Sequence, residues 1–132
     1  MEDDLARLQR FYDAFNARAL PRILEFMDEQ IEFQSRFAAA GGAIYHGHDG
    51  VRGWLDDLAE AWETLEIEFE QAGHLEDGAM IALIVLHGRG RSSGLEIHEP
   101  VAHELQWRDG RVVRLSYRDR REAERLLGAT RS

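Results

Sequence analysis

The chain contains no cysteine and no lysine among its 132 residues, so all sixteen basic side chains are arginines. The absence of cysteine excludes disulfides and thiolate chemistry. No apolar run approaches the roughly 18–20 residues that a membrane-spanning helix needs. The acidic start, Met1 to Asp4, is unlike a secretory signal. We therefore expect a cytoplasmic protein with no membrane partner, and we interpret the absence of lysine as a coding bias.

Basic residues are also scarce relative to acidic ones. Sixteen basic residues against twenty-five acidic ones give a net charge of −9. Nucleic acid is therefore not an expected partner, because phosphate binding needs a basic surface. Residues 108–132 differ, with eight arginines against four acidic residues. We interpret this segment as a solvated strand and helix, with a docking patch for an acidic partner as the alternative.

Helical spacing of apolar residues predicts three helices in the first half of the chain. The first has Asp3 or Asp4 as its N-cap and ends before Pro21, which suits the first turn of a short second helix. The third is expected to be capped by Asp49. The apolar faces of these helices are formed by Leu5, Leu8, Tyr12 and Phe15, by Ile23, Leu24, Phe26 and Met27, and by Val51, Trp54, Leu55, Leu58 and Trp62.

Alternating apolar and polar residues predict five strands. The first covers residues 31–35, and residues 36–47, with three consecutive alanines and two adjacent glycines, are expected to form a mobile loop or lid. Helices first and strands later indicate one α+β domain over residues 1–132. We expect a cone-shaped curved antiparallel sheet packed with three N-terminal helices and a short C-terminal helix. The later elements are strands at 65–70, 79–86, 95–107 and 112–118, joined by hairpins, and a closing helix at 122–127.

Several segments of the chain resemble SnoaL-like proteins. They are residues 11–20, 45–55, 88–94, 101–103 and 107–113, so the resemblance covers nearly the whole chain. It implies the fold of the superfamily that includes nuclear-transport-factor-2-like proteins and ketosteroid isomerases. It also implies a pocket for a small apolar molecule and a homodimer formed through the outer sheet face. Because this superfamily holds both enzymes and binding proteins, the fold does not supply the function.

The catalytic patterns of these relatives are altered in this chain. Where the ketosteroid isomerase pattern has a helix tyrosine, a base aspartate and a hydrogen-bonding aspartate, the chain has Phe11, Ser35 and His103. Steroid isomerisation is therefore not expected. The limonene epoxide hydrolase pattern is incomplete, because no strand aspartate accompanies Arg89 and Arg91. The SnoaL polyketide cyclase pattern needs an inward carboxylate on a late strand. The alternation of side chains along these strands decides which carboxylate could face inward.

Side-chain alternation predicts which residues of the late strands face the pocket. His103 would face inward and His87 outward, unless a bulge near the glycines reverses the latter. The set that includes Ala102 and Glu104 would be solvated. The other residues expected to face inward are Ala82, Ile84, Leu86, Val101, Leu105, Trp107, Val113, Leu115 and Tyr117.

His103 and Glu99 are the candidate catalytic residues. An imidazole with a pKa near 6.5 can give or take a proton at neutral pH, and burial of His103 would favour its neutral form. The alternative is a core histidine satisfied by Tyr117, Ser35 or water. Glu99 shares the parity of His103, but Pro100 between them can mark a bulge. The candidate ligand-binding residues are Phe11, Phe15, Phe33, Ser35, Trp54, Leu58, Ile84, Val101, Leu115 and Tyr117.

Two functions remain open from the sequence. The first is a protein that binds a small apolar or polyketide-like molecule and transfers protons as an isomerase, cyclase or dehydratase. The second is a non-catalytic binding or sensing domain. No cofactor and no metal site is predicted, because the histidines His46 and His48 have no third ligand at a sensible spacing.

Overall fold

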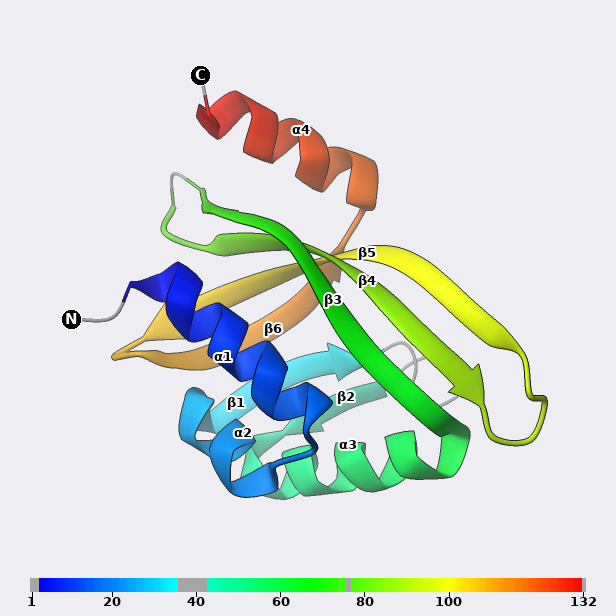
Figure 1. Cartoon of the computed structure of the whole chain (residues 1–132). Coiled ribbons are helices and arrows are strands. Elements are labelled where there is room, and N and C mark those ends of the chain that lie inside the picture. Colours follow the sequence, from blue (N-terminus) through cyan, green and yellow to red (C-terminus); the bar gives the residue numbers. More distant parts are fainter. Residues whose placement is uncertain (1–2, 36–42, 76, 132) are drawn as a thin grey trace.

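A curved sheet of six strands forms the centre of the molecule, in the order β2-β1-β6-β5-β4-β3 (Figure 1). The structure, a computed structural model, describes residues 3–35, 43–75 and 77–131. The elements are α1 (Asp4–Asn16), α2 (Leu20–Phe26), β1 (Met27–Ser35), β2 (Ala43–His46), α3 (Gly47–Ala61), β3 (Trp62–His74), β4 (Met80–Gly90), β5 (Glu96–Arg108), β6 (Arg111–Arg118) and α4 (Arg120–Arg131).

The predicted α+β class with a curved sheet is confirmed. Helices α1, α2 and α3 lie on one side of the sheet and α4 lies on the other (Figure 1). One strand pair differs from the expected antiparallel arrangement, because β1 pairs in parallel with β6. The sheet is therefore mixed, and this pairing joins the first strand to the last one and holds the β1–β2 edge against the late strands.

Residues 43–46 form strand β2 in a segment where the sequence predicted only a loop. This strand pairs antiparallel with β1, so that Tyr45 lies opposite Phe33. The rest of the predicted loop or lid, residues 36–42, lies outside the described residues. Helix α3 begins directly after β2, so Asp49 lies in its first turn and is not the N-cap. Trp62 begins β3 and does not extend α3.

Side chains at the end of α1 form hydrogen bonds with the backbone of β3. The Asn16 amide donates to the carbonyl of Ile67 (2.9 Å) and accepts from its N–H (2.8 Å). Arg18 has a φ of 53°, an uncommon conformation for a residue with a side chain. Its guanidinium donates to the carbonyls of Phe15 (2.6 Å) and Leu65 (2.7 Å). These bonds hold α1 at a fixed position against the concave face.

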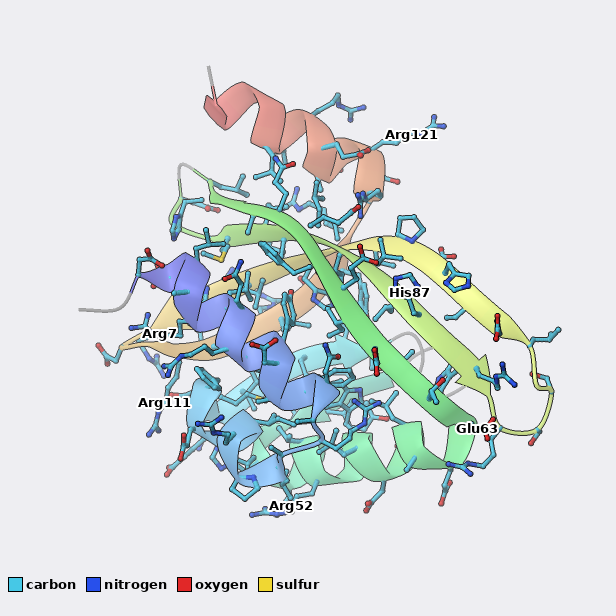
Figure 2. The ribbon with its side chains drawn as sticks, in the orientation of Figure 1. Arg7, Arg52, Glu63, His87, Arg111 and Arg121 are labelled. Carbon is cyan, nitrogen blue, oxygen red and sulfur yellow. The ribbon has the colours of Figure 1, made fainter. Side chains whose placement is uncertain are left out.

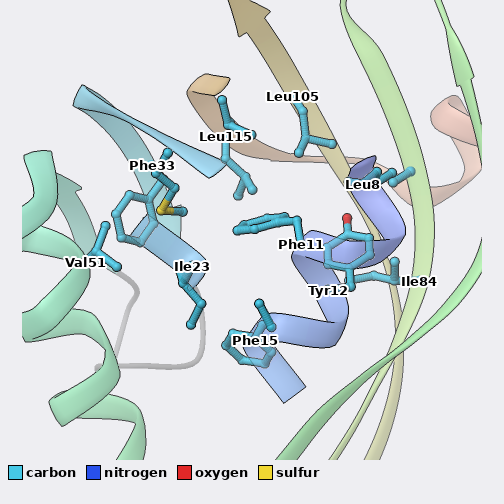
Figure 3. Close-up of a cluster of buried hydrophobic side chains, with 14 of the residues drawn as sticks. Leu8, Phe11, Tyr12, Phe15, Ile23, Phe33, Val51, Ile84, Leu105 and Leu115 are labelled. Atoms are coloured by element: carbon cyan, nitrogen blue, oxygen red, sulfur yellow. The ribbon is translucent and has the colours of Figure 1, made fainter. Parts of the chain in front are cut away.

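Two apolar clusters lie on opposite faces of the sheet. The larger fills the concave side beneath α1, α2 and α3, where Phe11, Phe15 and Phe33 point into a common interior (Figure 3). The smaller lies under α4 and consists of Ile81, Leu83, Ala102, Ala123 and Leu127, with Leu75 packed against it. Ala102 was expected to be solvated and is fully buried, because α4 covers this part of the outer face.

A β-bulge in β6 reverses part of the predicted alternation. The register shifts between Gln106 and Trp107, so that Trp107 pairs with Val112. Val112 is fully buried and Val113 is only half-buried, the opposite of the prediction. The extra residue changes which side chains point inward at that end of the strand. Beyond the bulge, Leu115 and Tyr117 keep the predicted inward parity and pair with Leu105 and His103.

Candidate functional site

An aromatic cavity lies on the concave side of the sheet, enclosed by α1, α3, β1 and the later strands. Its free volume is about 30 Å³, enough for water but not for an organic molecule. The predicted site residues that line it are Phe11, Phe15, Phe33, Ser35, Trp54, Leu58, His103, Leu115 and Tyr117. Helical spacing and strand alternation therefore predicted most of the residues that line the cavity.

Three predicted site residues do not line this cavity. Ile84 and Val101 pair with each other across β4 and β5 and lie within the packed core. Glu99 is exposed. It pairs with Leu86 in a regular register, so its parity is as predicted and Pro100 causes no register shift. However, β6 pairs with β5 only as far as Ala102, which leaves Glu99 on an uncovered edge.

The buried polar centre of the cavity is a hydrogen bond between Tyr12 and His103. The Tyr12 hydroxyl lies 2.9 Å from Nδ1 of His103. The two residues are 2% and 5% exposed. His103 is the only partner of this hydroxyl among the hydrogen bonds of the described residues, so we assign Tyr12 as donor. His103 then carries its proton on Nε2.

The other ring nitrogen of His103 has no hydrogen-bond partner among the described residues. His103 instead contacts the rings of Tyr12 and Tyr117, with centroid distances of 5.9 and 5.0 Å. With Tyr12 bonded to Nδ1, the group left without a protein partner is a Nε2–H donor beside an apolar cavity. The buried side-chain atoms without a partner in the described part of the chain are Trp107 Nε1 and Arg120 Nε, so Nε2 of His103 is open to the cavity and can donate to an acceptor oxygen there.

Burial sets the charge of this centre. Desolvation lowers the pKa of His103 from 6.5 to about 4, so the imidazole is neutral at physiological pH. Desolvation, with a smaller contribution from Tyr117, raises the pKa of Tyr12 well above its usual value, so the phenol keeps its proton. The centre is thus an uncharged pair of hydrogen-bonding groups. It is suited to an uncharged polar group and poorly suited to a bound anion or cation.

A second polar group lines the cavity. Ser35, at the end of β1, is buried and accepts a hydrogen bond from the Trp54 indole N–H at 3.1 Å. Trp54 also stacks on Phe15 with centroids 5.2 Å apart and meets Phe33 edge-on. The aromatic wall is therefore held by α1, β1 and α3 together, and the Ser35 hydroxyl proton is available for donation.

Sequence reasoning missed Tyr12 as a site residue, although it placed Tyr12 on the buried stripe of the first helix. A buried tyrosine needs a partner for its hydroxyl, and that need was the signal that could have linked it to His103. The other cavity residues that were missed are Met27, Gln34, Leu65, Ile67 and Leu86. Leu86 had been predicted to face inward, and His87 beside it faces outward as predicted.

His46, at the end of β2, and His48, in the first turn of α3, are not part of a metal-binding cluster. His48 bonds through Nε2 to the carbonyl oxygen of Met27 at 2.9 Å. Within the described ranges, no three side chains of the His, Cys, Asp and Glu types converge on a common point. None of the helices that the structure describes is long and apolar enough to cross a membrane.

Comparison with known proteins agrees with this architecture. Residues 8–115 match the SnoaL-like domain family, so the chain belongs to this family. No curated protein matches the chain.

Solved structures show the same fold at low identity. A nuclear-transport-factor-2-like protein of unknown function from Burkholderia pseudomallei has a TM-score of 0.78 and 18% identity, covering 96% of this chain and 98% of its own. TerC, co-crystallised with polyporic acid, has a TM-score of 0.75 and 16% identity, covering 94% and 97%. A protein with a ketosteroid isomerase-like fold from Catenulispora acidiphila, in complex with trimethylamine, has a TM-score of 0.74 and 14% identity, covering 86% and 84%.

Proposed function

We propose that this protein binds a small, flat, largely apolar molecule that carries one hydrogen-bond acceptor oxygen. The observation that carries the proposal is the Nε2–H of the neutral His103, fixed by Tyr12 and without a protein partner in the described part of the chain. Aromatic side chains surround it and supply surface for a planar ring. The co-crystallisation of TerC with polyporic acid and the complex of the Catenulispora protein with trimethylamine support this proposal.

Binding requires the cavity to enlarge, because about 30 Å³ does not hold a ring system. Trp54 is the side chain we expect to move. It is only half-buried, and one hydrogen bond to Ser35 and its ring contacts hold it in place. Rotation of its indole would release Ser35 and open the space between α1 and α3. Ligand binding should therefore change the tryptophan fluorescence of the protein, and this change should be absent in Trp54→Phe.

Proton transfer is a second candidate function, and one observation favours it. Tyr12, His103 and Tyr117 converge on one end of the cavity and could hold an enol oxygen. The reaction also needs a base, and no carboxylate occurs among the described residues that line the cavity. Glu99 lies outside it, and His103 with a pKa of about 4 is a weak base. Binding without catalysis is therefore the better supported function.

A matched pair of ligands tests the proposal. 1-Tetralone and tetralin have nearly the same shape, but only the ketone offers an acceptor oxygen. Isothermal titration should show tighter binding of the ketone, and the preference should fall about fivefold in His103→Phe, as expected for one lost hydrogen bond.

Val101→Ala is the control, because Val101 is buried but lies outside the cavity lining. It should lower stability and leave the preference for the ketone unchanged. Equal affinities for the two compounds in the wild type, or a preference that survives in His103→Phe, would contradict the assigned role of His103. Failure of both compounds to bind, together with unchanged tryptophan fluorescence, would contradict the binding function itself.

We also propose that two copies associate through the outer face of β3, β4 and β5. Helix α4 covers Ile81, Leu83 and Ala102, which leaves the half of the outer face away from α4 for a partner. Light scattering after size-exclusion chromatography tests this assembly. A mass equal to one chain at high protein concentration would rule it out.

A further inference from the structure

Two histidines meet on the outer face of the sheet, the face opposite the aromatic cavity. His87 on β4 and His98 on β5 are register partners, and their Nδ1 atoms lie 2.6 Å apart. They point away from the concave side, because His103, five residues after His98, faces the cavity. His87 can be located on the sheet in Figure 2. We propose that this pair is a binding site for a first-row transition metal dication such as Zn²⁺.

The hydrogen bonds of the pair prepare it for a metal. Nε2 of His87 lies 2.6 Å from the Glu68 carboxylate, which can only accept a hydrogen bond when ionised. A neutral His87 therefore carries its proton on Nε2, and its Nδ1 presents a lone pair toward His98. A histidine ligand oriented by a carboxylate on its far nitrogen is the usual arrangement in protein zinc sites.

The geometry is close to what coordination requires. Two nitrogens bound to one tetrahedral Zn²⁺ at about 2.0–2.1 Å are about 3.3 Å apart. The Nδ1 atoms of His87 and His98, 2.6 Å apart, must separate by about 0.7 Å to reach that distance. Both rings lie at the surface, and the His87 side chain is 37% exposed, so small rotations suffice. The proton now shared between the rings moves to Nε2 of His98 through solvent.

The surroundings are electrostatically favourable for a cation. The hollow around the pair is lined by Glu63, Glu66 and Glu96 against the single cation Arg89, which is already paired with Glu96. Glu68 adds another negative charge. In the single chain, no third side chain among the described residues already converges with the two histidines, so water completes the coordination sphere. The pair lies on the outer face proposed for dimer contact, so zinc binding and dimerisation would compete.

Titration of the full chain with ZnCl₂ by calorimetry, in a buffer that does not bind metal, tests the proposal. One zinc ion per chain is expected. His87→Ala and His98→Ala should each weaken binding by at least about tenfold. His74→Ala is the matched control, because His74 is an exposed strand histidine beside a carboxylate, Asp4, at another place on the surface. Zinc binding that survives in His98→Ala, or no binding at millimolar zinc, would overturn the proposal.

Glu68 is a positioning residue in this scheme, and its role has a separate readout. Imidazole ¹⁵N spectra should show His87 with its proton on Nε2, and addition of zinc should shift Nδ1 of both histidines. Glu68→Gln should reduce the Nε2–H form of His87 and weaken zinc binding about tenfold, and Glu68→Asp should restore part of both. Zinc-induced shifts at His46 or His48 in place of His87 would contradict the assignment.

Discussion

The burial of a neutral His103 predicts a specific dependence of stability on pH. Folding lowers the pKa of this imidazole from 6.5 to about 4. Between these values the unfolded chain binds a proton that the folded chain rejects, so the free energy of unfolding must fall as the pH falls. The stabilising contribution is fully present above pH 6.5 and is lost progressively toward pH 4. One pKa unit corresponds to about 1.4 kcal/mol, so the loss by pH 4.5 is about 2–3 kcal/mol.

Urea unfolding of the wild type and of His103→Gln, at several pH values between 7.5 and 4.5, measures this effect. The glutamine can still accept a hydrogen bond from Tyr12 but does not titrate. Carboxylates protonate in both chains, so their contribution cancels in the difference between the two. The difference in unfolding free energy should change by about 2–3 kcal/mol across this range. A difference that stays constant from pH 7.5 to 4.5 would refute the buried, neutral state of His103.

Two further predictions concern hydrogen bonds that hold the site. Tyr12→Phe leaves Nδ1 of His103 unpaired and should cost about 1–3 kcal/mol in urea unfolding, whereas Tyr45→Phe, which removes a half-buried bond to Asp57, should cost less. Equal losses of unfolding free energy in the two variants would show that the buried Tyr12 bond contributes no more to stability than the half-buried Tyr45 bond. Asn16→Ala removes both bonds to Ile67 and should cost about 1–3 kcal/mol. A melting temperature within one degree of the wild type would contradict this role of Asn16.

Alternation and helical spacing were sufficient to predict the elements that enclose the cavity. The stripe that includes Phe15 and the alternation around His103 depend only on which residues each element must bury, and the structure places both residues at the cavity. The helix order and the late hairpins follow from the same local signals. The family membership, carried by motifs spread over the chain, agrees with them.

Features that depend on contacts distant in the sequence could not be predicted in this way. The parallel pairing of β1 with β6 joins the start of the chain to its end. Ala102 is buried because α4 returns over the sheet, and no local pattern around Ala102 indicates this. Val112 and Val113 are both apolar, so the sequence does not show which one the bulge turns inward. Glu99 has the predicted parity, but its exposure depends on where β6 ends.

The Tyr12–His103 bond shows the same limit within the site. Each residue was predicted to be buried, one on a helix and the other on a strand 91 residues away. The partners expected for His103 were Tyr117, Ser35 or water. The structure gives the Nδ1 bond to Tyr12, makes Tyr117 a ring contact and pairs Ser35 with Trp54. Which of several buried polar groups bonds to His103 depends on how α1 packs against the sheet, and the sequence pattern does not give this packing.

The central claim is that a neutral His103, held by Tyr12, offers its Nε2–H to a ligand oxygen inside the aromatic cavity. Imidazole ¹⁵N spectra at pH 6, recorded with and without 1-tetralone, test it most directly. We predict a neutral His103 with its proton on Nε2, and a shift of the Nε2 resonance when the ketone is added. A protonated imidazolium at pH 6, or an Nε2 resonance that saturating ketone leaves unchanged, would contradict the claim.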